Sequence, residues 1–198
     1  MGGNMRVNAA LIVTVLFYSS AYAQAGTDLS PVSCTWEKLP VAEQTRLNDE
    51  FKVEIKDGSF TLFFASADAT AAAEPARACQ LNLSPPQTEA LALSLSRHAA
   101  VEKAKKGIAG KGEDPASLQI ALGKMHEGKR ETIGDVLACP GPHPMVKEWD
   151  ESVSGAVRRA NLRFKDGRAY SWVSLGLYAI FAEEGAVRRM TGANADPC

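Results

Sequence analysis

Residues 170–181 read Tyr-Ser-Trp-Val-Ser-Leu-Gly-Leu-Tyr-Ala-Ile-Phe, the most apolar stretch of the chain outside its N-terminal segment. At helical spacing both of its sides are apolar. One side carries Tyr170, Val173, Leu177, Ile180 and Phe181, and the other carries Trp172, Leu175 and Ala179. A helix of this kind is covered by neighbours, and the run is too short for a bilayer span of about 20 residues. The stretch therefore predicts a central helix around which the chain packs.

The first 23 residues have the three parts of a secretory signal peptide. Arg6 precedes an uncharged apolar run over residues 9–18, and residues 21–23, Ala-Tyr-Ala, place small side chains where signal peptidase cleaves. We expect cleavage after Ala23, which leaves a single helical domain over residues 24–198. An N-terminal membrane anchor is the weaker interpretation, because the apolar run is short and no charged stop-transfer segment follows it.

Export defines the expected compartment. Met5, directly before Arg6, is an alternative start that leaves a signal peptide of more usual form. No cysteine follows the apolar run closely, since Cys34 is the first, so we do not expect an N-terminal lipid anchor. We predict a periplasmic or secreted protein with no stable membrane span after cleavage of the signal peptide.

Length and charge exclude some classes of protein. The chain has 198 residues, which suits one domain. Its 22 basic and 23 acidic residues nearly balance, with a formal net charge of −1. A nucleic-acid-binding protein usually shows a strong basic bias, so we expect no nucleic-acid partner.

The cysteines suggest a covalent framework. All four, Cys34, Cys79, Cys139 and Cys198, lie after the signal peptide, and an even number in an exported protein predicts two disulfides. Three pairings are open. We prefer Cys34 with Cys79 and Cys139 with Cys198, because each bond then ties a terminal segment to the nearer half of the domain. Each bond would contribute about 3–4 kcal/mol. No Cys-x-x-Cys motif for redox exchange or zinc is present.

Helical periodicity and capping signals recur along the chain. The clearest start is Ser84-Pro85-Pro86-Gln87, where Ser84 can cap, Pro85 suits the first helical position and Gln87 completes a capping box. The predicted helices, about six to seven in number, are residues 40–51, 69–79 interrupted at Pro75, 85–106 ending at Gly107, 115–127 ending at Gly128, 132–137, 145–164 and the central stretch.

Residues 52–64 allow two interpretations. Apolar and polar residues alternate around Asp57-Gly58, a strong signal for a two-residue hairpin. The alternative is a pair of helical segments separated by that dipeptide. We favour the helical interpretation, because an isolated hairpin is marginally stable without a further partner. The predicted fold class is thus mainly α, a compact disulfide-stapled helical domain that leaves room for a β-hairpin at residues 52–64, with α+β as the alternative.

The segment 139–144, Cys-Pro-Gly-Pro-His-Pro, contains three prolines. Because proline lacks an N–H and restricts the backbone, we expect this segment to end all regular structure and to separate the preceding helices from a C-terminal pair. In that pair the helix over 145–164 would end at Gly167, and the central helix would follow as its antiparallel partner. A second hairpin at Asp166-Gly167 is disfavoured, because the apolar run that follows is about twice the usual strand length of about 5–6 residues.

The histidines are the first candidates for an active site. His98, His126 and His143 show no metal-binding spacing. His98 reads as a residue at the edge of the core, and His126 suits a helix C-terminus. His143 lies four residues after Cys139 and could join its thiol in a nucleophilic or metal site if that thiol were free.

The acidic residues do not single out a catalytic pair either. Glu183 and Glu184 follow the central stretch, and Glu184 with Arg188 forms an i,i+4 pair that contributes only about 0.3–0.5 kcal/mol. The sequence carries none of the common hydrolase or phosphate-loop motifs. We therefore assign no catalytic, cofactor-binding or metal-binding residue.

These observations favour a non-enzymatic binding or interaction module of the bacterial cell envelope, whose partner is another envelope protein or a small ligand. The alternative is a small helical-scaffold enzyme or metal-binding protein with a site near His143 or His98. A purely structural envelope protein is the third hypothesis. A pocket that joins at least two of the histidines and the Glu183-Glu184 carboxylates would favour the enzyme, and histidines on separate faces would favour the module.

Overall fold

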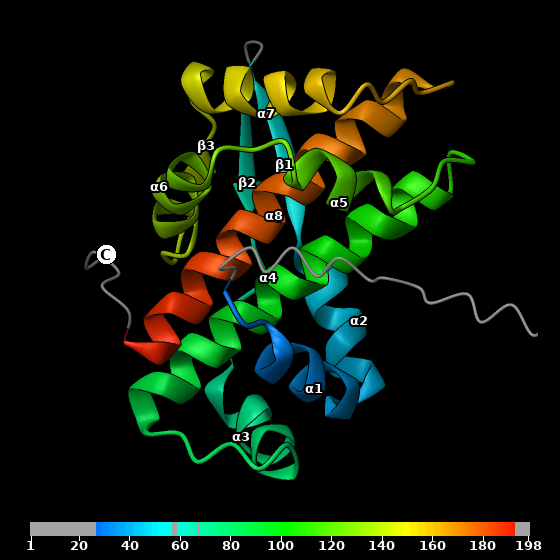
Figure 1. Ribbon diagram of the computed structural model, residues 1–198. Helices are drawn as coiled ribbons and strands as arrows, with labels where there is room; N and C mark the ends of the chain where they lie inside the picture. Colours follow the sequence, from blue (N-terminus) through cyan, green and yellow to red (C-terminus); the bar gives the residue numbers. More distant parts are fainter. Residues whose placement is uncertain (1–26, 57–58, 67, 193–198) are drawn as a thin grey trace, which may run out of the picture.

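The computed structural model describes residues 27–56, 59–66 and 68–192. This part of the chain is mainly helical with a small antiparallel sheet (Figure 1), which confirms the predicted class. The helices are α1 Ser30–Lys38, α2 Val41–Glu50, α3 Ala69–Ala78, α4 Pro85–Ala109, α5 Ser117–Leu122, α6 Glu127–Leu137, α7 Lys147–Arg159 and α8 Gly167–Thr191. The strands are β1 Lys52–Lys56, β2 Ser59–Phe63 and β3 His143–Pro144.

Helices α4 and α8 form the centre of the molecule (Figure 1). They run antiparallel, so that Gln87 near the start of α4 donates a hydrogen bond to the carbonyl of Met190 near the end of α8, at 3.2 Å. The predicted central stretch lies within α8, and its Leu177, Tyr178 and Phe181 are fully buried. The predicted central helix is thus confirmed, and it continues ten residues further than the apolar stretch.

The start of α4 follows the predicted capping box. The backbone N–H of Ser84 donates to Gln87 Oε1 at 2.9 Å, and Pro85 is the first helical residue. The predicted end at Gly107 is wrong, because the helix continues to Ala109. Gly107 instead makes room for a neighbour, since a Cβ there would lie 2.3 Å from Cδ2 of Trp172 on α8.

Glycine also brings α6 against α8. A Cβ at Gly134 would lie 2.4 Å from the carbonyl oxygen of Phe181, and one at Gly185 would lie 2.2 Å from that of Gly134. Helix α6 begins at Glu127, five residues before the predicted start at Thr132, so Gly128 lies inside it rather than ending the helix before it. That preceding helix is α5, which ends at Leu122.

Pro75 does not interrupt α3, contrary to our prediction. Proline has no backbone N–H, so Pro75 removes one hydrogen bond from the helix. The helix nevertheless continues through Pro75 to Ala78. Asp68 caps the start by accepting hydrogen bonds from the N–H groups of Thr70 and Ala71, at 2.8 and 3.3 Å. The end of α3 is anchored by a disulfide between Cys79 and Cys34 of α1, with an S–S distance of 2.07 Å.

Residues 52–56 and 59–63 pair as the two antiparallel strands of a hairpin, so the helical interpretation of residues 52–64 is wrong. The partner that the hairpin needs comes from the proline-rich segment, because β2 pairs with β3 in the order β1-β2-β3. Leu62 lies opposite His143, and the N–H of Met145 donates to the carbonyl of Phe60 at 2.9 Å. The segment 139–144 therefore contains regular structure, in contrast to our prediction.

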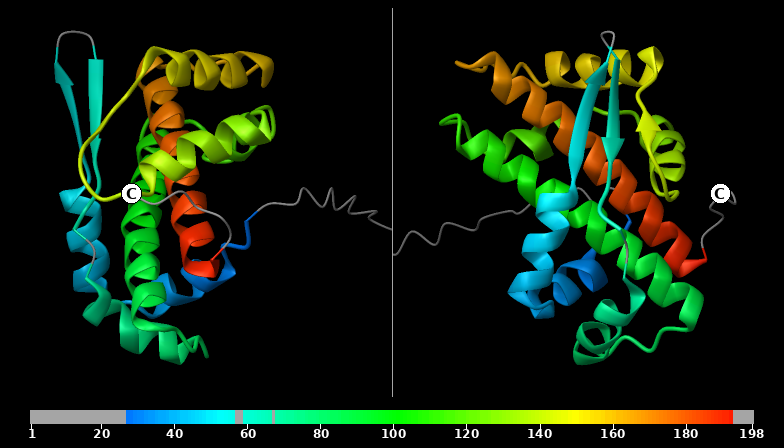
Figure 2. Two further views of the ribbon diagram at one scale, coloured as in Figure 1. Left: turned by 90° about the vertical axis from the view of Figure 1, so that its left-hand side faces the viewer. Right: turned by 180° about the vertical axis from the view of Figure 1, so that it is seen from behind.

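Helix α7 crosses the N-terminal half of α8 and does not form an antiparallel pair with it (Figures 1 and 2). The main neighbours of α8 are α4 and α6. Gly167 does not end α7 but begins α8, where Asp166 Oδ1 accepts a hydrogen bond from the N–H of Arg168 at 2.8 Å. Tyr170 ties the two helices together by donating to Ser154 Oγ at 2.7 Å.

The Cys34–Cys79 bridge is one half of the predicted pairing. The other half, Cys139 with Cys198, falls on a residue outside the described part of the chain, as do the predicted signal peptide and its cleavage site. Within the described ranges, no helix has the length and apolar character needed to cross a membrane.

Candidate functional site

An apolar cleft lies between the hairpin and the N-terminal half of α8. It consists of two adjoining hollows of about 250 and 380 Å³. Both hollows are lined by Val53 and Ile55 of β1 and by Ser171 and Leu175 of α8. The smaller one is also lined by Phe60, Asp150, Tyr170 and Ser174, and the larger one by Phe51, Lys103, Arg168 and Trp172.

The cleft follows from the way in which the hairpin stands beside α8 (Figure 2). Val53 lies opposite Leu62 and Ile55 opposite Phe60, so these four side chains share one face of the sheet. That face turns towards α8, where the Phe60 ring packs 5.9 Å from the ring of Tyr178. Leu62 is fully buried, yet Ile55 remains 79% exposed. The outer part of the hairpin therefore overhangs α8 without filling the space beneath it.

The side chain of Ile55 is exposed to water, so it does not contribute the stabilisation that its burial would give. Burial of an isoleucine side chain contributes about 1.5–3 kcal/mol. The side chain already lies on the inward face, next to the half-buried Val53 and Leu175. An apolar molecule in the cleft would remove these side chains from water without any rearrangement of the fold.

One hydroxyl in the lining of the cleft, that of Ser174, lacks a partner. Ser174 lines the smaller hollow, and its Oγ is buried without a hydrogen bond, as is the hydroxyl of Tyr178 one turn further along α8. Burial, together with Asp150 and Tyr170, raises the pKa of Tyr178, so its hydroxyl stays protonated and can donate. An unsatisfied buried polar group costs about 1–3 kcal/mol. A ligand atom that accepts a hydrogen bond here would recover that free energy.

Charged side chains also line the cleft. The exposed Asp150 of α7 lines the smaller hollow, and the exposed Arg168, at the start of α8, lines the larger one. Lys103 is already engaged, because its Nζ donates to the carbonyls of Asn48 and Phe51 at 2.8 and 3.0 Å. The lining of the cleft is thus mainly apolar, with the Ser174 hydroxyl and a few charged side chains, which is the usual composition of a small-molecule site.

Two of the residues considered from the sequence do meet. His98 Nδ1 of α4 lies 2.8 Å from Glu183 Oε1 of α8, and Glu183 is only 2% exposed. The Trp36 ring packs 5.1 Å from the His98 ring. This pair lies inside the helix packing and does not line the cleft, so its placement is that of a buried polar contact between α4 and α8.

Glu184 belongs to a second buried contact. It pairs with Arg130 of α6, while burial raises the pKa of the Glu184 carboxyl. Arg188 does not take Glu184 as its partner, because it pairs with Asp135 of α6 at 2.7 Å. The i,i+4 pair proposed from the sequence is therefore replaced by contacts between helices.

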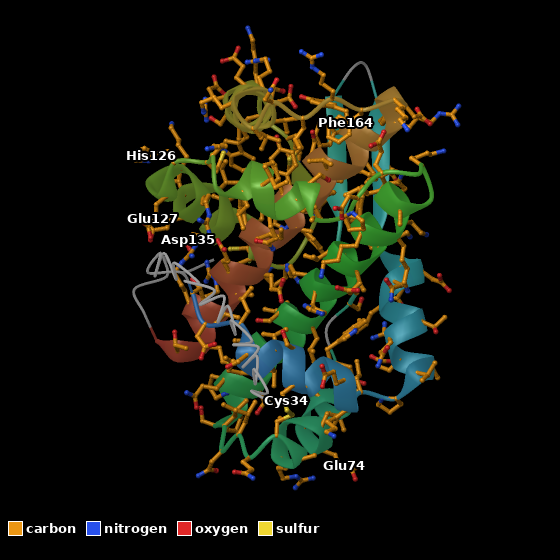
Figure 3. The ribbon with its side chains drawn as sticks, turned by 45° about the vertical axis from the view of Figure 1, so that its right-hand side comes forward. Cys34, Glu74, His126, Glu127, Asp135 and Phe164 are labelled. Atoms are coloured by element: carbon orange, nitrogen blue, oxygen red, sulfur yellow. A yellow bond between two sulfur atoms is a disulfide. The ribbon has the colours of Figure 1, made fainter. Side chains whose placement is uncertain are left out.

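The other two histidines lie elsewhere. His143 Nε2 is 2.9 Å from the carbonyl oxygen of Cys139, so the imidazole is engaged with the backbone at that residue. His126 does not lie near a helix C-terminus as expected but is the N-cap residue of α6, exposed at the outer edge of the molecule (Figure 3). Among the residues that the structure describes, no group of three or more His, Cys, Asp or Glu side chains is placed to hold a metal ion.

Sequence reasoning did not identify the cleft. Its walls come from β1 and α8, which are more than a hundred residues apart. The alternation of Val53 and Ile55 was the available signal, but it is informative only if residues 52–64 form a hairpin that stands beside α8. No protein-family model, curated protein or solved structure matches this chain.

Proposed function

We propose that this protein is an exported, non-enzymatic binding protein of the bacterial cell envelope, and that its cleft holds a small apolar ligand with a hydrogen-bond acceptor. The observation that carries the proposal is the combination of an exposed apolar side chain, Ile55, on the inward face of the hairpin with the unpartnered hydroxyl of Ser174.

The size and lining of the cleft support a small ligand. The larger hollow, of about 380 Å³, lies within the range of about 300–1,000 Å³ that is usual for such sites, and the adjoining hollow of about 250 Å³ extends it. The apolar part of the ligand would lie against Val53, Ile55 and Leu175. Its acceptor would face the hydroxyl of Ser174. A protein partner is the second candidate, and it is disfavoured because Ser174 Oγ is buried, where a flat surface would not reach it.

The positions of the histidines support a binding role over catalysis. His98 is paired with Glu183, His143 with a backbone carbonyl, and His126 stands at the far end of α6. A general base has to lie within hydrogen-bond reach of a substrate. None of these three imidazoles lines the cleft.

Export is supported by the signal-peptide pattern of residues 1–23 together with the disulfide between Cys34 and Cys79. Disulfides persist in oxidising compartments such as the periplasm and the extracellular space. We therefore place the binding activity outside the cytoplasm.

The test is the binding of N-phenylnaphthylamine, an uncharged apolar fluorophore, to the mature chain. Ser171 is exposed and lines both hollows, so Ser171→Trp would fill the cleft without disturbing the core. We expect the fluorescence enhancement to fall at least about tenfold in this variant. The matched control is Thr132→Trp at an exposed position of α6, which should bind the fluorophore as the unmodified protein does.

Equal binding by both tryptophan variants would exclude the cleft as the binding site. Loss of binding in both would mean that the added indole acts on the fold or on the fluorescence and not on the cleft. Thermal unfolding of each variant separates these cases, because a cleft-filling change should leave the melting temperature unchanged or raise it.

A further inference from the structure

A separate hollow of about 470 Å³ lies where the end of β2, α4 and the proline-rich segment meet. It shares no residue with the cleft beneath the hairpin. Its walls include Phe63, Phe64, Leu93, Arg97, Pro140 and Pro142. Apart from Arg97, these side chains are apolar, so Arg97 is the charged residue among those that line the hollow.

Arg97 is unusually deep for a charged residue, with only 2% of its surface exposed. Its Nη2 donates to the carbonyls of Leu137, Ala138 and Cys139, at 3.3, 3.4 and 2.8 Å. Its Nη1 donates to Ser96 Oγ at 2.8 Å and, at 3.4 Å, to a carbonyl one turn back on α4. Its Nε–H is buried and has no acceptor.

All of these acceptors are neutral, although a buried charge in a protein is normally paired. The C-terminal carbonyls of α6 offset part of the charge through the helix dipole, which amounts to about half an elementary charge. Arg189 adds a second positive charge nearby, and burial together with Arg189 lowers the pKa of Arg97 to about 10. The neighbouring Asp135 carboxylate is taken by Arg188, at 2.7 Å.

We propose that this hollow is a second binding site and that its ligand is a small organic monocarboxylate. The carboxylate would accept the unused Nε–H of Arg97 and supply a negative charge that its described acceptors do not provide. The apolar part of the ligand would pack against Phe63, Leu93 and Pro140. A fully hydrated inorganic anion would fit these walls less well, because it offers no apolar surface to cover them.

Leu93 allows a direct test, because it is half-buried, lines the hollow and precedes Arg97 by one helical turn. Leu93→Glu would place a carboxylate of the chain itself at i,i+4 to Arg97, in the favourable order. Leu93→Gln has the same shape without the charge and is the matched control. The probe is sodium hexanoate, with hexan-1-ol as the uncharged analogue and sodium chloride at equal ionic strength.

We expect hexanoate to raise the melting temperature of the mature protein and of Leu93→Gln, because a ligand that binds only the folded state stabilises it. Leu93→Glu should weaken hexanoate binding at least about tenfold relative to Leu93→Gln, measured by calorimetric titration. Hexan-1-ol and chloride should have little effect on either variant.

Three results would overturn the proposal. These are the absence of any hexanoate effect on the unmodified protein, equal binding by the Glu and Gln variants, and equal stabilisation by hexanoate and hexan-1-ol. Ser171→Trp provides a further check, because it fills the other cleft. If that variant abolished hexanoate binding, the probe would lie beneath the hairpin and the proposal for Arg97 would fail.

Discussion

Three pairs of titratable side chains join α4, α6 and α8 among the residues that the structure describes. His98 with Glu183, Arg130 with Glu184, and Arg188 with Asp135 each join two helices. Of the two arginine–carboxylate pairs, Arg130 with Glu184 is the more buried, with side-chain exposures of 11% and 8%. Such pairs add little net stability over apolar residues of the same volume, but removal of one partner is costly because it leaves the other charge buried.

The cost of leaving Glu184 buried without its partner can be tested by replacing Arg130. Arg130→Met should lower the free energy of unfolding by about 3–5 kcal/mol at pH 8, measured by urea denaturation. In the variant, the buried Glu184 would have a folded-state pKa above its unfolded value. Between those two values the folded state binds more protons than the unfolded state, so the deficit should shrink as the pH falls towards 5.

The control is Arg158→Met, which removes an exposed arginine from α7 and should change the free energy of unfolding by no more than about 0.5 kcal/mol. A deficit in Arg130→Met that did not depend on pH would mean that lost packing, and not the unpaired carboxylate, is the cause.

Arg97 illustrates a residue that local sequence reasoning passes over. It lies one position before His98, on a helix face that turns towards α6 and the proline-rich segment. An arginine in an amphipathic helix usually lies on the solvated side. Its burial depends on the end of α6 about forty residues later, and no spacing within α4 reveals that contact.

At the scale of elements, close packing of helices depends on positions without a side chain. Gly107→Ala would put a methyl group 2.3 Å from the indole of Trp172, whereas alanine is otherwise favoured over glycine in a helix by about 1 kcal/mol. We expect the clash with Trp172 to outweigh the gain in helix propensity, so that the free energy of unfolding falls by about 1–3 kcal/mol.

Gly123→Ala is the matched control for this prediction. Gly123 has a right-handed helical backbone, and a Cβ there would have its nearest contact at 3.5 Å, an ordinary van der Waals distance. Chemical denaturation of both variants should show a loss for Gly107→Ala and no loss, or a small gain, for Gly123→Ala. Equal stability of the two would show that Trp172 moves aside at little cost.

The helical prediction for residues 52–64 is wrong because local patterns do not reveal the third strand. Both the hairpin and the helical interpretations of residues 52–64 were available from local patterns. The choice depended on whether a third strand exists, and that strand is a two-residue segment, His143–Pro144, about eighty residues away. Proline in a strand is tolerated at an edge, and β3 is one of the two edge strands of this sheet.

At the scale of the whole molecule, export and covalent closure can be tested together. We predict that the chain, expressed in full in a bacterial host and recovered from the periplasm or the medium, begins at Gln24. Mass spectrometry under non-reducing conditions should find no free thiol and should show a peptide that links Cys139 to Cys198 as well as the Cys34–Cys79 pair.

Treatment with a reductant followed by alkylation is the control, because it should add four alkyl groups. Retention of residues 1–23 would contradict the proposed export. Free thiols at Cys139 and Cys198 would contradict the second bridge and would restore the hypothesis of a thiol site near His143.

Features that depend on neighbouring residues could be predicted from the sequence. The apolar run at residues 170–181 predicted the central helix, and Ser84 with Gln87 predicted where α4 begins. Such signals are reliable because periodicity and capping act within one or two helical turns.

Features that join distant segments could be recognised only in the folded molecule. These are the pairing of β2 with β3, the contact of Gly107 with Trp172, the cleft between Ile55 and Ser174, and the burial of Arg97 beneath the proline-rich segment. Each depends on which surfaces meet when the helices pack around α8. That outcome is set by the summed free energy of many weak contacts across the molecule and not by any short stretch of chain.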